Sequence, residues 1–178
     1  MSPKHYQDPG HLHYLTFSCY RKLWLFKSPS LYANFLKILQ QARLRLRFKL
    51  YGFVLMPNHV HLLLYPEPDL SLSTILRAIK QPSAYSGLNY LAAHQPALHA
   101  QLEVNRGGQS EHRFWQAGGG YDRNIYRDET FVHTLEYMHY NPVRKKLVTS
   151  PRDWPWSSAR FYESRVPEPI ALDWPEWW

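Results

Sequence analysis

The sequence is short of cysteine, of long apolar runs and of negative charge. Its 178 residues include one cysteine, which excludes an internal disulfide framework and a cysteine-based zinc cluster and agrees with a reducing compartment. No run approaches the roughly 18 apolar residues that a membrane-spanning helix needs. The N-terminus also has no apolar stretch behind a basic start. We therefore predict a cytoplasmic protein that does not enter a membrane.

The charge is positive over most of the chain. Lysine and arginine number 21 against 14 aspartates and glutamates, which gives a net charge of +7. All 21 cations but only 11 of the acids lie in residues 1–165, so this part carries +10 and favours a polyanionic partner such as nucleic acid. We predict one domain over residues 1–165, followed by an acidic, tryptophan-rich tail over residues 166–178.

Two interpretations of this tail are open. Its three acids and three tryptophans suit a segment that lies across a cationic DNA groove, with carboxylates in the place of phosphates and indoles in the place of stacked bases. Such a tail would be autoinhibitory. Alternatively, the tryptophans complete the core, as tryptophan usually does, or the terminus is disordered.

Hydrophobic patterns predict an α+β protein. The predicted elements are a strand over 12–20, a helix that begins at Ser28-Pro29, a hairpin over 51–56 and 60–65, helices over 71–80 and 84–93 divided at Pro82, a loop over 94–120, and a helix over 128–141 capped by Asp128. The end of the first helix is open, because residues 43–50 alternate as a strand would. A ferredoxin-like antiparallel sheet with helices packed on it fits this order best.

A pair of histidines carries the clearest chemical signal. His59 and His61 flank Val60 in a predicted strand, where side chains at i and i+2 project from the same face about 6 to 7 Å apart. Two imidazoles in this position can share one metal ion, although a site needs at least a third ligand. The alternative is two unrelated polar residues beside a turn.

A helix further along the chain offers further polar groups. His133, Tyr137 and Asn141 lie at i, i+4 and i+8, which places them on one stripe of a helix. The stripe is either part of a site or an ordinary solvent-facing side. The first interpretation requires that the helix meets the histidine strand.

Four segments together resemble the REP-associated tyrosine transposases, relatives of the single-tyrosine insertion-sequence transposases of the HUH nuclease superfamily. They are MPNHVHLLL, RFWQAGGGYDRNI, EYMHYNPVRKKLV and DWPWSSAR, in this order. The resemblance implies the HUH nuclease fold and a divalent ion, Mg²⁺ or Mn²⁺, held by His59, His61 and Asn141. It also implies that Tyr137 is the nucleophile, which cleaves single-stranded or hairpin DNA and leaves a 5′-phosphotyrosine and a free 3′-OH.

Several roles stay open around this assignment. His133 is a candidate base or DNA contact, and Tyr121 is a rival nucleophile that follows three glycines. The Gly118–Gly120 run with Asp122 and Arg123 is expected to shape a loop beside the site. The candidate phosphate contacts are Arg43, Arg45, Arg47, Arg77, Lys80, Arg123, Arg144, Lys145 and Lys146.

Two other functions compete with the transposase. One is a nucleic-acid-binding regulator without catalysis, and the other is a phosphodiesterase that uses water and does not need Tyr137. A monomer and a homodimer are both compatible with the sequence.

Overall fold

The computed structural model describes residues 11–165 and 169–175. Its strands are β1 (Leu12–Ser18), β2 (Lys49–Met56), β3 (His59–Tyr65), β4 (Glu103–Arg106), β5 (Gln109–His112) and β6 (Tyr121–Ile125). Its α-helices are α1 (Pro29–Leu46), α2 (Leu72–His94), α3 (Pro96–Ala100), α4 (Asp128–His139), α5 (Asn141–Arg144) and α6 (Ala159–Ser164). Short 3₁₀ turns cover Tyr20–Lys22 and Pro151–Asp153. None of the described helices is long and apolar enough to cross a membrane.

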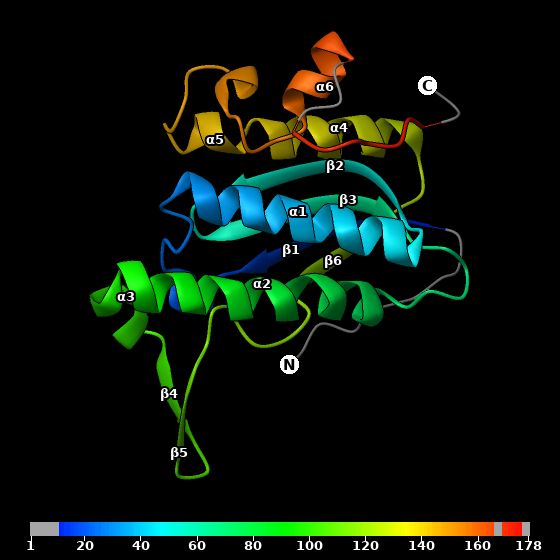
Figure 1. Ribbon diagram of the computed structural model, residues 1–178. Helices are drawn as coiled ribbons and strands as arrows, with labels where there is room; N and C mark the ends of the chain where they lie inside the picture. Colours follow the sequence, from blue (N-terminus) through cyan, green and yellow to red (C-terminus); the bar gives the residue numbers. More distant parts are fainter. Residues whose placement is uncertain (1–10, 166–168, 176–178) are drawn as a thin grey trace.

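Four strands form one antiparallel sheet in the order β2-β3-β1-β6 (Figure 1). The chain passes from β1 through α1 to the β2–β3 hairpin, and α2 leads on toward β6 at the other edge. This is the ferredoxin-like arrangement, so the predicted fold class is confirmed. The hairpin turn falls at Pro57 and Asn58, as predicted.

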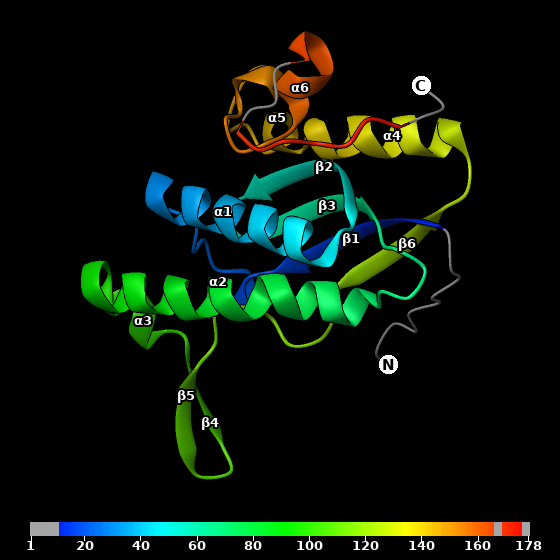
Figure 2. The same ribbon diagram turned by 45° about the vertical axis from the view of Figure 1, so that its right-hand side comes forward.

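Helices cover both faces of the sheet (Figures 1 and 2). On β1, Leu15 and Phe17 belong to a core shared with α1 and α2, whereas Leu12 and Tyr14 belong to a second core shared with α4. This division follows from the alternation of side chains along a strand. The face covered by α4 is the one that carries His59 and His61, because Leu63 of the same strand lies in the second core.

The first helix ends later than an alternating pattern alone would suggest. Ser28 caps α1 by accepting a hydrogen bond from the Ser30 N–H, as predicted. Arg47, in left-handed backbone with φ 58°, ends the helix. The alternating residues 43–46 are therefore helical, and their cations are spread around α1.

Four expectations about chain segments are wrong. Pro82 does not divide the helix, because α2 runs unbroken from Leu72 to His94 with the proline on its exposed side and its apolar side packed on the core. Residues 94–120 are not one loop, since they contain α3 and the β4–β5 hairpin, which projects from the body (Figure 2). Asp122 and Arg123 lie in the edge strand β6, and the cap of α4 is Arg127 rather than Asp128.

The described part of the tail packs on the body of the protein. The Asp173 carboxylate accepts hydrogen bonds from Arg43 Nε at 3.0 Å and from the Leu50 N–H at 2.7 Å. The Trp174 ring contacts Phe161, and Leu172 contacts the main core. This packing favours the interpretation in which the tail completes the core. Glu168, Glu176, Trp177 and Trp178 lie outside the described residues.

Candidate active site

The two histidines of β3 project from the same face of the sheet, as predicted. Their Nε2 atoms are 3.0 Å apart, and the two rings stand nearly perpendicular, at 89°. His61 is buried and His59 is half-buried, so the pair lies at the edge of the core with one side toward solvent.

The turn before β3 fixes the tautomer of His59. The Nδ1–H of His59 donates to Asn58 Oδ1 at 2.6 Å, while Asn58 Nδ2 donates to the Lys22 carbonyl at 3.3 Å. A neutral imidazole with its proton on Nδ1 has a lone pair on Nε2. The lone pair of His59 is therefore directed at His61.

The neighbouring strand β1 fixes His61 in the same way. His61 Nδ1 lies 2.7 Å from the Tyr14 hydroxyl and 2.9 Å from Thr16 Oγ1. On its other side, Asn141 Nδ2 donates to His61 Nε2 at 2.7 Å, so the proton of His61 is on Nδ1. Tyr14 and Thr16 were missed by sequence reasoning. They face His61 only through the register of β1 against β3, which pairs Thr16 with His61.

The junction of α4 and α5 delivers Asn141 to the histidines. Tyr140 keeps helical backbone between the two helices, and its N–H bonds to the Glu136 carbonyl at 2.9 Å. Asn141 is buried and its side chain reaches His61, whereas Tyr137 lies one turn earlier with 54% of its surface exposed. The helix and the histidine strand therefore meet, as the interpretation of the stripe as part of a site requires.

Burial keeps both imidazoles neutral. It lowers the pKa of His59 to about 4, with further contributions from the charges of Lys145 and Lys22. Burial also lowers the pKa of His61 well below its ordinary value, and the nearby His59 and Arg144 add to this. Neutral imidazoles are the form that ligates metal ions.

A cleft of about 620 Å³ opens beside His61 on the α4 side of the sheet. Both candidate nucleophiles, Tyr137 of α4 and Tyr121 of β6, line it together with His133. Tyr14 also lines the cleft, but burial raises its pKa to about 12, which keeps this hydroxyl protonated. The cleft therefore presents two exposed tyrosines to a substrate.

Arg144 lies directly against Tyr137. Its guanidinium carbon is 4.3 Å from the centre of the Tyr137 ring, and its Nη2 donates to the Tyr137 carbonyl. A fixed cation thus sits next to the phenol in the cleft.

The other candidate phosphate contacts fall into separate groups. Arg123 lines the same cleft as Tyr137, and Lys145 and Lys146 follow α5. Arg45 and Arg77 line a groove between α1 and α2, on the opposite face of the sheet from the histidines. Arg47 lies at the end of α1, remote from the histidines.

Two candidate phosphate contacts have structural partners. Arg43 pairs with Asp173 at 2.8 Å. Lys80 donates to the Gly118 carbonyl at 2.7 Å and so holds the loop that precedes β6. Neither residue is among those that line the cleft that holds Tyr137.

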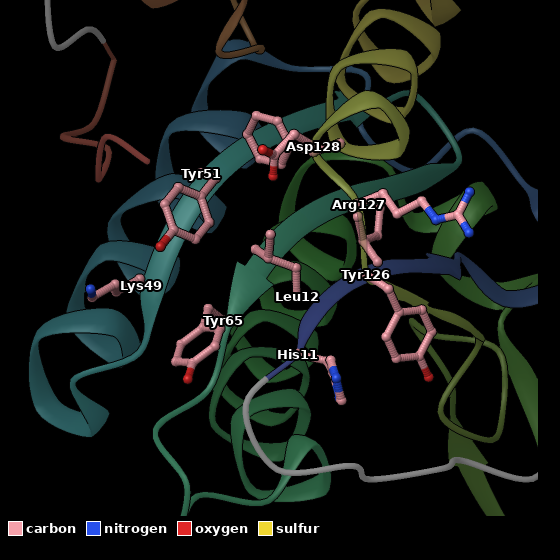
Figure 3. Close-up of a pocket in the computed structure, with 10 residues that line it drawn as sticks. His11, Leu12, Lys49, Tyr51, Tyr65, Tyr126, Arg127 and Asp128 are labelled. Carbon is pink, nitrogen blue, oxygen red and sulfur yellow. The ribbon is translucent and has the colours of Figure 1, made fainter. Parts of the chain in front are cut away.

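A second pocket, of about 370 Å³, lies at the other end of the sheet, where α4 begins (Figure 3). Tyr51, Tyr65, Tyr126 and the charged residues Lys49 and Arg127 line it. None of the candidate catalytic residues is among its lining residues.

The side chains beside the cleft offer three ligands to a divalent ion only if the Asn141 amide is one of them. Within the described ranges, no group of three or more histidines, cysteines or carboxylates is placed to hold a metal ion. His59, His61 and Asn141 form such a group once the amide is included. Two nitrogen donors at about 2.1 Å from an ion and at right angles to each other lie about 3.0 Å apart, which matches the separation of the two Nε2 atoms.

Comparisons with known proteins agree with this architecture. The family described as Transposase IS200 like matches residues 7–118, a segment that contains both histidines and ends before both candidate tyrosines. A Haemophilus influenzae protein named as a REP-associated tyrosine transposase is 27% identical over 128 residues, which is 71% of this chain and 66%, just under two thirds, of that protein. A solved REP-associated tyrosine transposase bound to a REP hairpin superposes with a TM-score of 0.69 at 19% identity, over 98% of this chain and 92% of that chain.

The chain shares its fold with the solved transposase, and the family match over residues 7–118 defines its class as that of the transposases, which are enzymes. Because the family match covers more than half of the chain, the chain belongs to the IS200-like transposase family.

Proposed function

We propose that this chain is a metal-dependent single-stranded DNA endonuclease and strand transferase that acts on hairpin-forming DNA. The observation that carries the proposal is the approach of two side chains to His61 Nε2, beside the cleft that Tyr137 lines: His59 Nε2 lies 3.0 Å from it and Asn141 Nδ2 lies 2.7 Å from it. The hairpin as substrate is suggested by the solved relative, which is bound to a REP hairpin.

The three side chains fit a divalent ion by their chemistry. The lone pairs of His59 and His61 face each other at 3.0 Å, an arrangement that a shared cation stabilises. Asn141 supplies an oxygen when its amide turns over, which exchanges Nδ2 and Oδ1 at the same place. A bound Mn²⁺ or Mg²⁺ would polarise the scissile phosphate and offset its developing charge. Since imidazole is not the preferred ligand of Mg²⁺, we expect Mn²⁺ to bind more tightly.

Tyr137 acts as the nucleophile in this scheme. Its phenolic oxygen forms a bond to the phosphorus while the bond to the 3′ oxygen breaks, so the products are a 5′-phosphotyrosine and a 3′-OH. The phenol proton passes to water or to His133, which lies one turn earlier and lines the same cleft. The 3′ oxygen takes up a proton as it leaves. Arg144, against the Tyr137 ring, stabilises the phenolate and the phosphate charge.

The test is covalent capture of the cleaved strand. The chain is incubated with Mn²⁺ and a hairpin oligonucleotide that carries a single-stranded flank and a 3′ label, and the products are separated on a denaturing gel. We expect a labelled protein adduct that Tyr137→Phe abolishes while DNA binding persists. The matched control is Tyr121→Phe, which removes the other exposed hydroxyl from the same cleft and should leave the adduct in place.

Other outcomes identify other functions. Cleavage without an adduct that survives in Tyr137→Phe indicates a water mechanism, and an adduct lost only in Tyr121→Phe identifies the other tyrosine. Binding with no cleavage in any metal indicates a non-catalytic DNA-binding regulator.

The metal ligands are tested by the same assay. His59→Ala and His61→Ala each remove a nitrogen donor, so cleavage should fall by orders of magnitude, because the ion supplies several kcal/mol of charge stabilisation. Asn141→Ala should have a milder effect, since water replaces a neutral oxygen ligand. Wild-type cleavage by all three variants across a Mn²⁺ titration would refute this ligand set.

A further inference from the structure

A basic turn lies beside the histidine pair, and the roles assigned above do not use its side chains. Arg21 and Lys22 follow β1, are exposed, and both have left-handed backbone, with φ of 52° and 55°. This conformation is uncommon for residues other than glycine, asparagine and aspartate, and it persists only where the surroundings impose it. Two successive residues of this kind therefore mark a turn that the fold holds in one shape.

Hydrogen bonds from three segments hold this turn. The Lys22 N–H donates to the Cys19 carbonyl at 3.0 Å, and the Arg21 N–H donates to Gln116 Oε1 at 3.3 Å. The Lys22 carbonyl accepts from Asn58, the residue whose other amide atom accepts from His59. One side chain thus fixes the basic turn and the orientation of a candidate ligand together.

A third cation approaches from the opposite side. Lys145 follows α5, and its N–H donates to the Asn141 carbonyl at 3.0 Å. The charges of Lys22 and Lys145 both act on His59. Figure 1 shows α5, the β2–β3 turn and the start of α1 gathered at the same end of the sheet. The turn and α5 therefore flank the histidine pair.

These cations lack negative partners within the protein. In the part of the chain that the structure describes, no carboxylate forms an ion pair with Arg21, Lys22 or Lys145. The Arg21 guanidinium lies 5.0 Å from the centre of the Tyr20 ring, which limits its freedom. An ordered, uncompensated positive surface of this kind suits an anion.

We propose that Arg21, Lys22 and Lys145 form a clamp for the backbone phosphates of single-stranded DNA that flank the scissile phosphate. The inference rests on the proposed function, because it takes the histidine pair as the place of cleavage. Arginine and lysine bind phosphate oxygens without regard to base sequence, so the clamp positions the strand and does not select it.

The test is the salt dependence of binding to a single-stranded oligonucleotide. In Arg21→Asn/Lys22→Asn both charges are removed, and asparagine tolerates left-handed backbone, so thermal stability should be retained. Each lost phosphate contact lowers the slope of log K against log salt by about 0.7 for single strands, so two contacts lower it by about 1.4. Between about 50 and 200 mM salt, the wild-type chain should therefore lose about sevenfold more affinity than the variant.

A matched control lies at the far end of the first helix. Arg47 has the same charge and the same left-handed backbone, with φ of 58°, but it ends the 18-residue α1. A helix of this length places it about 27 Å from the start of α1. We expect Arg47→Asn to keep the wild-type slope. Arg21→Lys/Lys22→Arg, which keeps both charges, should also keep it.

A variant outside the strained turn keeps the test decisive if Arg21→Asn/Lys22→Asn does not fold. Lys145→Ala removes the third cation from ordinary backbone and should lower the slope by about 0.7. A wild-type slope in both Arg21→Asn/Lys22→Asn and Lys145→Ala would overturn the clamp. Since binding requires no cleavage, that result is distinct from failure of the proposed function, which would appear as absence of the covalent adduct in the wild-type chain.

Discussion

The hydroxyl of Tyr14 is expected to control metal binding without contacting the metal ion. It lies 2.7 Å from His61 Nδ1, is buried, and stays protonated because its pKa is raised to about 12. The proton on Nδ1 must be donated to Tyr14 or Thr16 if Nε2 is to present a lone pair. Tyr14→Phe removes one of these two acceptors and leaves Thr16 Oγ1, which lies 2.9 Å from His61 Nδ1, to accept the proton.

The size of the effect follows from this redundancy. Loss of a partner behind a ligating histidine typically costs about 10- to 100-fold in metal affinity or activity. With Thr16 still in place, we expect Tyr14→Phe to raise the half-saturating Mn²⁺ concentration by about tenfold, near the low end of that range. The double variant Tyr14→Phe/Thr16→Val leaves a buried N–H without an acceptor. It should approach 100-fold and lose about 1 to 3 kcal/mol of stability.

The assay is adduct formation against Mn²⁺ concentration, with unfolding by urea measured in parallel. Tyr121→Phe is the control, since it removes a hydroxyl from the same cleft but not from His61. A double variant with the wild-type Mn²⁺ dependence would show that the Nδ1 partners of His61 do not tune the site. A lower maximum rate at saturating Mn²⁺, with an unchanged midpoint, would place Tyr14 in substrate binding instead.

Three further predictions concern stability. Gly120→Ala should cost several kcal/mol in urea unfolding, because its Cβ would lie 2.1 Å from the Thr16 carbonyl oxygen at φ 84°. Gly118→Ala, at φ 91° with no atom within 4 Å, should cost only about 1 kcal/mol; equal losses would contradict the clash. Asp173→Ala should lower the free energy of unfolding by about 1 to 2 kcal/mol, a value that is reduced because Asp173 is partly exposed. Its affinity for single-stranded DNA should be unchanged. Tighter binding would support an autoinhibitory tail instead. Burial lowers the pKa of His139 to about 3. On acidification the unfolded chain therefore binds a proton at this histidine before the folded chain does, so stability falls as the pH drops below about 6.5. His139→Gln should flatten that fall by up to about 1.4 kcal/mol per pH unit, and an unchanged pH profile would exclude this histidine as its source.

Local periodicity accounts for what the sequence predicted correctly. The shared face of His59 and His61 depends only on the two-residue repeat of a strand, and the stripe from His133 to Asn141 depends only on the helical repeat. The cap at Ser28 is a local hydrogen bond. These features need no knowledge of which elements meet in space.

The elements that were missed are polar and take their structure from distant partners. Strand β6 reads YDRNI, and it is ordered by pairing with β1 more than 100 residues earlier, including a contact of 3.0 Å between His13 and Asp122. The β4–β5 hairpin turns at Gly107 and Gly108, both with positive φ, and its strands are almost wholly exposed. Hydrophobic alternation is absent from both, so pattern analysis could not find them.

The segment DWPWSSAR links strand β2 to the end of α4. The Ser158 hydroxyl accepts from the Phe53 N–H at 2.9 Å and from His139 Nε2 at 2.8 Å, so it ties β2 to the last residue of α4. The Ser158 N–H also donates to the Phe53 carbonyl at 2.9 Å, and the Trp156 carbonyl accepts from the Leu55 N–H at 2.8 Å. This segment therefore extends the backbone hydrogen bonding along β2.

The position of α4, which carries the candidate nucleophile Tyr137, therefore depends on residues far beyond the matched segment 7–118. Gly52 of β2 lets α4 approach closely, because a Cβ there would lie 2.8 Å from Leu135 Cδ1. Ser158 then sets the height of the helix end above the sheet through His139. Since Asn141 follows His139 by two residues, the 2.7 Å contact that brings it to His61 is determined by this packing. The two halves of the candidate site are thus specified separately: the histidines by the strand, and Tyr137 with Asn141 by the way the C-terminal segments hold α4.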